Sequence, residues 1–331
     1  MKNQILSSLR LSHIGVLFFL SVVLAFFCYN ANLSLCIPLF LLLLGFYLWN
    51  QRHLNYKFLL NLGLLLALIV FISYASITYI GFSAFFIPVS AVGLLVVLLY
   101  NDLALALIMS FAASVLVGSM AGNRFDLVLI YFVGSFVGAF SLKDARTRGQ
   151  FINAGFVISI FQVLCIILLN PYQDFLLSKN FIFNYFMPLF LNGFISAFLV
   201  VATLKVFEYL FGVVTNFSLL ELSDFNQPLL KKMILEAPGT YHHSLFVSNL
   251  ADSAADAIGA NALLCRVGAY YHDIGKIDKA EYFTENQIFA PNKHDTLEPT
   301  MSRLIIFNHV KNGVEIAQKN KLHPVLMDFI E

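Results

Sequence analysis

Long apolar runs alternate with short polar breaks over the first 212 residues of the chain. A membrane-spanning helix needs about 20 mostly apolar residues. Because one run is short and the breaks near Asn101 and Gly122 are narrow, both seven and eight spans fit the pattern, and eight fit it better. We therefore predict a transmembrane bundle at 13–211 after an N-terminal segment at 1–12, with spans at 13–29, 36–50, 57–76, 82–100, 103–120, 126–142, 152–169 and 185–211.

After residue 212 the apolar positions recur with helical spacing between polar ones. The stretch 219–235 is typical of an amphipathic helix interrupted before Pro228, so we assign 212–236 to a juxtamembrane helical connector. A turn is predicted at 237–240, then a helix that carries His243, and a second helix at 262–272. The predicted fold class is all-α, with a polytopic transmembrane helical bundle followed by a soluble helical domain at 237–331.

Composition and charge agree with this division. Hydrophobic residues make up 59% of the 331 positions and charged residues only 12%, where soluble proteins have about 25% charged residues. Residues 1–212 hold 10 of the 20 Lys and Arg but 5 of the 19 Asp and Glu, which makes this part net +5 and the remainder net −4. Residues 1–212 are therefore suited to the lipid bilayer, and the remainder to water.

The positions of the basic residues predict the orientation. They collect in the N-terminal segment, at 51–57 and at 143–148, and eight spans place all three groups on one side, which the positive-inside rule makes cytoplasmic. We expect a multi-pass protein of the inner (plasma) membrane whose C-terminal half lies in the cytoplasm. The first run is interpreted as an uncleaved anchor, with a cleaved signal peptide as the alternative.

Two other classes of site find little support in the sequence. Hardly any ionisable residue falls at mid-membrane depth, which disfavours a transporter. The four cysteines form no CxxC pair, so neither a zinc knuckle nor a disulfide scaffold is indicated.

Histidine and aspartate in the soluble half have a spacing typical of a metal centre. His272 and Asp273 end an apolar helix, His243 lies 29 residues before His272, and His309 lies 36 residues after Asp273. Three imidazoles and a carboxylate suit Mn, Fe or another divalent ion, and the carboxylate can bridge to a second ion. A lone His-Asp pair is common, and a histidine such as His309, taken by itself, is more often a core or helix-surface residue than a ligand.

Three further histidines are placed outside this centre. His242 neighbours His243 but points about 100° away from it on a helix. His294 lies with Asp295 in a polar stretch typical of a loop, and His323 precedes a proline and has a structural interpretation.

Several motifs together resemble a known family. They are LEL at 220–222 with PLL at 228–230, APGTYHHS at 237–244, VGAYYHDIGK at 267–276, ENQ at 285–287 and HV at 309–310. This set resembles the seven-transmembrane HD hydrolases, bacterial membrane-bound cyclic-di-AMP phosphodiesterases of the PgpH type, from about residue 36 onward. The resemblance implies hydrolysis of cyclic di-AMP to the linear dinucleotide pApA, in a site that holds two divalent ions, Mn or Fe.

The resemblance also implies roles for individual residues. His243, His272 and Asp273 would bind one ion, and Asp273 with His309 would help to bind the second. The catalytic residues would be Asp273 and Lys276, with Lys276 contacting phosphate or holding Asp273. The implied partners are a cyclic dinucleotide and the lipid bilayer, with no nucleic acid polymer. The oligomeric state is undetermined, and a homodimer is one possibility.

Two features depart from the family pattern. Only residues 30–35 separate the first two predicted spans, where the family has a large extracytoplasmic domain. The family also supplies a His-His pair and a later Asp after a segment like 324–331, so we expect this sequence to be truncated inside the HD domain, to end within a helix with an uncovered apolar face, and to be inactive alone. The alternatives are an HD phosphohydrolase for another cyclic dinucleotide or nucleotide, and a non-catalytic membrane receptor or scaffold.

Overall fold

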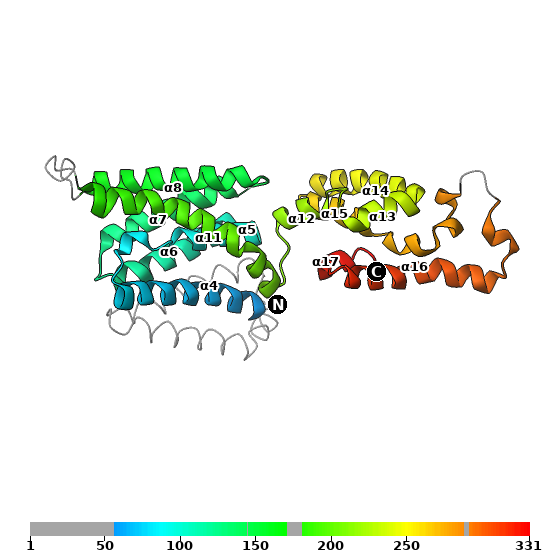
Figure 1. Ribbon diagram of the computed structural model, residues 1–331, viewed down its shortest axis with the longest axis horizontal. Helices are drawn as coiled ribbons and strands as arrows, with labels where there is room; N and C mark the ends of the chain where they lie inside the picture. The colour runs from blue at the N-terminus through cyan, green and yellow to red at the C-terminus, as the bar shows by residue number, and fades with distance from the viewer. Residues whose placement is uncertain (1–55, 144, 171–180, 288–290) are drawn as a thin grey trace, which may run out of the picture. The chain divides into compact units, whose positions relative to one another are not determined.

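The computed structural model describes residues 56–143, 145–170, 181–287 and 291–331 (Figure 1). All regular elements in these ranges are helices, which confirms the predicted all-α fold class. The chain divides into two compact units between Val213 and Val214.

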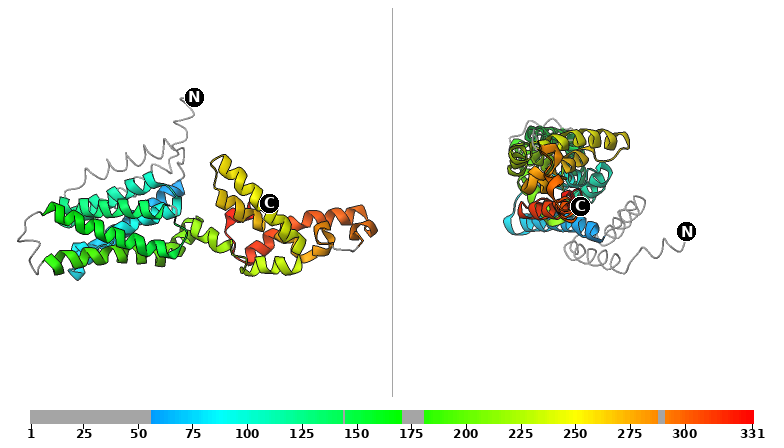
Figure 2. Two further views of the ribbon diagram at one scale, coloured as in Figure 1. Left: turned by 90° about the horizontal axis from the view of Figure 1, so that it is seen from above. Right: turned by 90° about the vertical axis from the view of Figure 1, so that its right-hand side faces the viewer.

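The first unit is a bundle of long apolar helices (Figure 2). Within the described ranges, five helices are long and apolar enough to cross a membrane, and a shorter apolar stretch covers Ala84–Tyr100. The chain is therefore a multi-pass membrane protein. The predicted spans 13–29 and 36–50 lie outside the described residues. The helices are α4 (Tyr56–Ala75), α5 (Ser90–Tyr100), α6 (Leu103–Met120), α7 (Phe125–Leu142), α8 (Arg148–Leu169) and α11 (Met187–Phe211), with π-helical turns at Ser76–Ile80 and Ile182–Phe186.

The prediction of one helix over 82–100 was wrong. This stretch consists of a 3-10 turn at Ala84–Phe86, an extended residue Ile87, and α5, which begins only at Ser90. Pro88 explains the break, because proline has no N–H and disfavours helical geometry in the residue before it. Irregular backbone at membrane depth requires partners from the protein, and Asn192 Nδ2 supplies them by donating to the carbonyl oxygens of Phe85 (2.9 Å) and Ile87 (2.7 Å).

Small residues allow α8 and α11 to lie side by side (Figure 1). A Cβ built on Gly193 would lie 2.3 Å from the carbonyl oxygen of Gly155, and one on Gly155 would lie 3.2 Å from the Cβ of Ala197. Close backbone approach at small residues is a usual way for membrane helices to associate. Any side chain larger than hydrogen at Gly193 would force the two helices apart.

The second unit is a smaller helical domain. Helix α12 ends before the break at 223–227 and α13 begins at Pro228, as predicted. The helices are α12 (Asn216–Leu222), α13 (Pro228–Glu236), α14 (Pro238–Ala257), α15 (Ala262–Tyr271), α16 (Pro299–Lys319) and α17 (Pro324–Met327), with 3-10 segments at Ile274–Tyr282, Thr284–Asn286 and Lys293–Thr296.

The turn predicted at 237–240 was wrong. Ala237 alone leaves helical geometry (φ −137°, ψ 62°), and α14 begins at Pro238. Proline is well tolerated at the first position of a helix, where its missing N–H has no intrahelical partner in any case. The earlier start places His243 in the second turn of α14.

The core of the second unit includes Leu230, Met233, Tyr271 and Leu326, each 1% exposed or less. The Tyr271 hydroxyl donates to the backbone oxygen of Leu222 (2.7 Å) and so ties α15 to α12. The expectation of an uncovered apolar face at the end of the sequence was also wrong: α17 ends at Met327, and both Leu326 and Ile330 are buried in this core.

Candidate metal centre

Helices α14 and α15 bring two histidines to one carboxylate. His272 and Asp273 follow directly after α15, and the Asp273 side chain is only 7% exposed. His272 Nε2 lies 3.2 Å from Asp273 Oδ2, and Nε2 of His243, which projects from α14, lies 3.9 Å from the same oxygen. The ligand atoms of these three residues all lie within 4.8 Å of one another.

Helix α16 supplies His309 on the other side of the carboxylate. Its Nε2 lies 3.5 Å from Asp273 Oδ1. The approach depends on Gly275, because a Cβ at this position would lie 1.8 Å from the backbone oxygen of His309 and 2.5 Å from the nitrogen of Gly313. The two oxygens of Asp273 therefore face different histidines, which is the arrangement a bridging carboxylate requires.

The backbone orients two of these imidazoles. His272 Nδ1 lies 2.8 Å from the carbonyl oxygen of Ala269, and His309 Nδ1 contacts that of Ile306. A ring nitrogen that faces a carbonyl oxygen carries a proton there, so in the neutral imidazole, the form that binds metals, the lone pair is on Nε2. In both residues the nitrogen that faces Asp273 is thus the one able to bind a metal.

Lys276 holds Asp273 from within the domain. Its Nζ lies 2.8 Å from Asp273 Oδ2 and 2.9 Å from Glu285 Oε1, and 5.1 Å from the centre of the Phe283 ring. Burial alone would raise the pKa of the Asp273 carboxyl, but hydrogen bonds and positive charge from His272 and Lys276 hold that pKa well below its usual range. Burial likewise opposes the charge on Lys276, yet its two carboxylate partners raise the pKa of the ammonium group.

A polar network that was not predicted surrounds this lysine. Thr240 Oγ1 donates to Glu285 Oε1 (3.2 Å), and Asn286 Nδ2 donates to Thr240 Oγ1 (2.9 Å). A Cβ on Gly239 would lie 1.8 Å from the Glu285 backbone oxygen, so only glycine allows this approach. The ENQ motif at 285–287 is the sequence feature that could have indicated this network, but the sequence alone does not show that Glu285 contacts Lys276.

Other histidines of the domain stay apart from the centre. His242 is exposed, with its ring beside that of Tyr241. His294 lies in the 3-10 segment Lys293–Thr296 against Tyr282, and His323 Nδ1 accepts from the Val325 backbone at the start of α17. Among the described residues, the four that converge are His243, His272, Asp273 and His309.

The donor set fits a divalent ion. Ligand atoms about 2.1 Å from one ion are at most about 4.2 Å apart, so His243, His272 and Asp273 need only a small closure to share one. Neutral imidazole and carboxylate suit first-row metals such as Mn and Fe. His309 with Asp273 Oδ1 offers two further donors to a neighbouring ion.

Comparison with known proteins matches both parts of the chain. Residues 27–215 match the family model of the 7TM receptor with intracellular HD hydrolase. The chain belongs to this family. Residues 240–331 match the HD domain, a domain that binds divalent metals, and contain all four convergent residues. The predicted resemblance is confirmed.

Two curated relatives carry the same name. The chain is 32% identical over 313 residues to the cyclic-di-AMP phosphodiesterase PgpH of Bacillus subtilis, covering 91% of this chain and 44% of the relative. It is 42% identical over 187 residues to PgpH of Listeria monocytogenes, covering 56% and 26%. The chain thus spans less than half the length of the curated relatives it matches.

Solved structures of the L. monocytogenes PgpH HD domain are also similar in sequence. One is 54% identical and covers 31% of this chain and 50% of that chain, with a TM-score of 0.31. Another, a complex with cyclic di-AMP, is 52% identical and covers 33% and 50%, with a TM-score of 0.32.

Proposed function

We propose that this chain carries the metal centre of a membrane-bound phosphodiesterase that hydrolyses cyclic di-AMP to linear pApA at the cytoplasmic face of the inner membrane. The observation that supports this most is the convergence of three histidines on the two oxygens of Asp273. Metal-dependent hydrolysis explains why a buried carboxylate is surrounded by imidazoles whose Nε2 atoms face its oxygens. The names of the B. subtilis and L. monocytogenes relatives indicate the substrate.

In this proposal the four residues share two divalent ions, Mn or Fe. His243, His272 and Asp273 hold one, and Asp273 and His309 hold part of the other. Such ions supply a nucleophilic water at neutral pH and positive charge beside the phosphoryl oxygens. In the reaction the oxygen of one water forms a bond to phosphorus, the bond from phosphorus to a ribose 3′ oxygen breaks, and that oxygen leaves with a proton.

Lys276 has two roles in the proposal. It keeps Asp273 ionised and oriented, because its largely buried ammonium group donates to Oδ2. Its positive charge also lies within reach of a phosphate that approaches the metal ligands. The first role depends on contacts within this domain, and the second on the bound substrate.

The membrane assignments complete the proposal. The bundle at 13–211 anchors the protein, the helices of 212–236 connect it to the HD domain, and the basic segments at 51–57 and 143–148 lie in the cytoplasm by the positive-inside rule. A cytoplasmic HD domain would meet an intracellular dinucleotide.

The test is metal content of the chain and hydrolysis of cyclic di-AMP by the complete protein, purified from membranes, with products separated by chromatography. His272→Ala and Asp273→Ala should each lose bound Mn or Fe and at least about 100-fold in pApA formation, because each removes a direct ligand. His242→Ala is the matched control, since it removes an exposed histidine next to a ligand. Full activity in His272→Ala, or equal turnover of cyclic di-GMP, would overturn the assigned chemistry or substrate respectively.

A further inference from the structure

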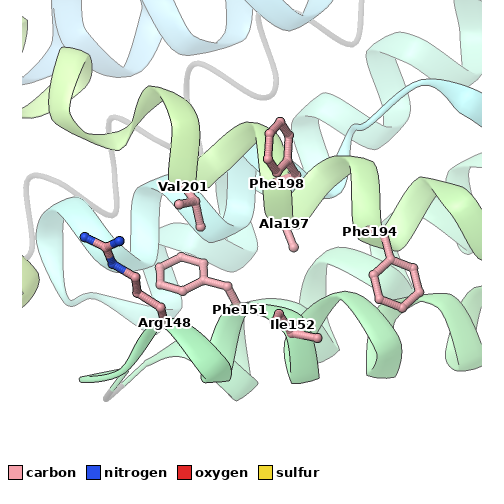
Figure 3. Close-up of a pocket in the computed structure, with 7 residues that line it drawn as sticks. All are labelled: Arg148, Phe151, Ile152, Phe194, Ala197, Phe198 and Val201. Carbon is pink, nitrogen blue, oxygen red and sulfur yellow. The ribbon is translucent and has the colours of Figure 1, made fainter.

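The outer face of the membrane bundle carries an apolar groove between α8 and α11, with a volume of about 370 Å³ (Figure 3). Its floor is formed by Phe151 and Ala197, which are 3% and 4% exposed, while Ile152 and Phe198 on its rim are 66% and 77% exposed. In the part of the chain that the structure describes, the groove is therefore open along its rim. On α11 its lining also includes Phe194 and Val201.

Helical spacing explains why these side chains share one groove. On α11 the lining positions 194, 197, 198 and 201 follow steps of three and four residues, and on α8 the positions 148, 151 and 152 do the same. Close contact at Gly155 and Gly193 holds the two helices together beside the groove. Ala197 leaves the floor hollow where a larger residue would fill it.

The groove has a polar group at one end only. Figure 3 shows Arg148 at one end of the row of side chains and Phe194 at the other. Arg148 is the first residue of α8, where the positive end of the helix dipole also favours an anion. Apart from Arg148, the side chains that line the groove are apolar.

Further basic residues lie near the same end. Arg146 precedes α8, and its backbone is held by a hydrogen bond from its N–H to Gln150 Oε1 (2.6 Å). Lys205 is exposed on α11, one turn beyond Val201. Positive charge at the membrane boundary joined to an apolar groove along the helices matches the two parts of a phospholipid, and basic pockets between transmembrane helices are known to bind anionic headgroups.

We propose that this groove binds one anionic glycerophospholipid. An acyl chain lies along Phe151, Ala197 and Phe198, and the headgroup phosphate accepts hydrogen bonds from the Arg148 guanidinium, which matches phosphate geometry well. Among the described residues that line the groove, only Arg148 offers side-chain hydrogen-bond donors, so the lining is poorly suited to a nucleotide or other polar ligand. The site is independent of the proposed hydrolase chemistry.

The experiment is native mass spectrometry of the full chain in detergent, titrated with phosphatidylglycerol or with phosphatidylcholine of the same acyl chains. The wild-type chain should retain about one phosphatidylglycerol and clearly less phosphatidylcholine. Arg148→Gln should weaken phosphatidylglycerol binding about fivefold, which corresponds to the roughly 1 kcal/mol that one basic residue contributes near an anionic surface. Lys231→Gln, an exposed change of the same charge in the other unit, should have no effect.

A second pair of variants tests the acyl-chain part. Phe198→Ala should lower retention of both lipids, whereas Phe140→Ala, which removes an equally exposed phenylalanine from α7 (67% exposed), should not. Equal retention of the two lipids by the wild type, or equal behaviour of the groove variants and their controls, would overturn the proposal. It would also be overturned if inorganic phosphate displaced the lipid completely, or if the groove were covered by a second copy in a lipid-free dimer.

Discussion

Lys276 Nζ lies 2.8 Å from Asp273 Oδ2, on the carboxylate that faces all three histidines of the candidate centre. The same nitrogen lies 2.9 Å from Glu285 Oε1, and Thr240 donates to that oxygen as well. The ion pair with Glu285 therefore holds the Lys276 side chain in place before any metal ion binds. A chain of contacts runs from α14 through Glu285 and Lys276 to the carboxylate.

This chain of contacts predicts the effect of Glu285→Gln. Without the negative charge, Lys276 is held less firmly and Asp273 is less well oriented, so metal affinity should fall about 10-fold to 100-fold, the usual cost of losing a residue that supports a ligand. Titration with Mn²⁺ measures it. Glu281→Gln is the control, because Glu281 is exposed and pairs with Lys293 at 3.6 Å rather than with Lys276. The same loss in both variants would contradict the role of Glu285.

The contact between Gly275 and α16 predicts a second result. Gly275→Ala places a methyl group against the His309 backbone oxygen, so α16 must shift, and the second unit should lose about 1–3 kcal/mol of unfolding free energy, as overpacked cores do. His309 would move away from Asp273, and metal binding should weaken too. Thermal unfolding and Mn²⁺ titration measure the two effects.

Gly149→Ala provides the matched control for this change. Gly149 lies in the first turn of α8, and a Cβ there meets nothing within 4 Å. Alanine should therefore be neutral or slightly stabilising at this position. Gly275→Ala with unchanged stability would show that the approach of the two backbones is looser than described.

Hydropathy and motif spacing predicted much of this molecule because they report local properties. The apolar runs at 57–76, 103–120, 126–142, 152–169 and 185–211 correspond to long helices of the bundle, and Pro228 separates α12 from α13 as expected. The spacing of His243, His272, Asp273 and His309 suggested a metal centre, and the resemblance to a family strengthened that inference. The assignment of these four residues as metal ligands stays a prediction.

The missed features depend on contacts between distant residues. The carbonyl groups of Phe85 and Ile87 accept from Asn192, about a hundred residues further along the chain, and no local pattern indicates such a pairing. The contact of Thr240 with Glu285 likewise joins residues 45 positions apart. The turn expected at 237–240 failed for a local reason, since proline and glycine together are typical of turns as well as of helix starts.

Asn192 predicts a third result, in the membrane unit. Asn192→Leu keeps the approximate size of the side chain but leaves the oxygens of Phe85 and Ile87 without this donor. The Ile87 oxygen keeps the Val89 N–H as a donor (2.8 Å), whereas the Phe85 oxygen loses its side-chain donor. A buried acceptor left unpaired costs about 1–3 kcal/mol, so the midpoint of thermal unfolding in detergent should fall. Ser110→Ala is the milder comparison, because the Ser110 hydroxyl donates to Ala106 of its own helix, and equal effects would show that Asn192 does not support the break.

Asp273 predicts how the metal-free domain responds to acid. Its folded-state pKa is depressed, so the unfolded chain takes up a proton at a higher pH than the folded one. The contribution of its ion pairs to stability is therefore fully present above the pKa of an unfolded aspartate, about 3.9, and is lost as the pH falls below that value toward the folded-state pKa. The comparison is urea unfolding of wild type and Asp273→Asn in chelator between pH 3 and pH 7. The wild type should lose stability relative to the variant only in the acidic part of this range, whereas a constant difference would show that the charge of Asp273 contributes nothing to the fold.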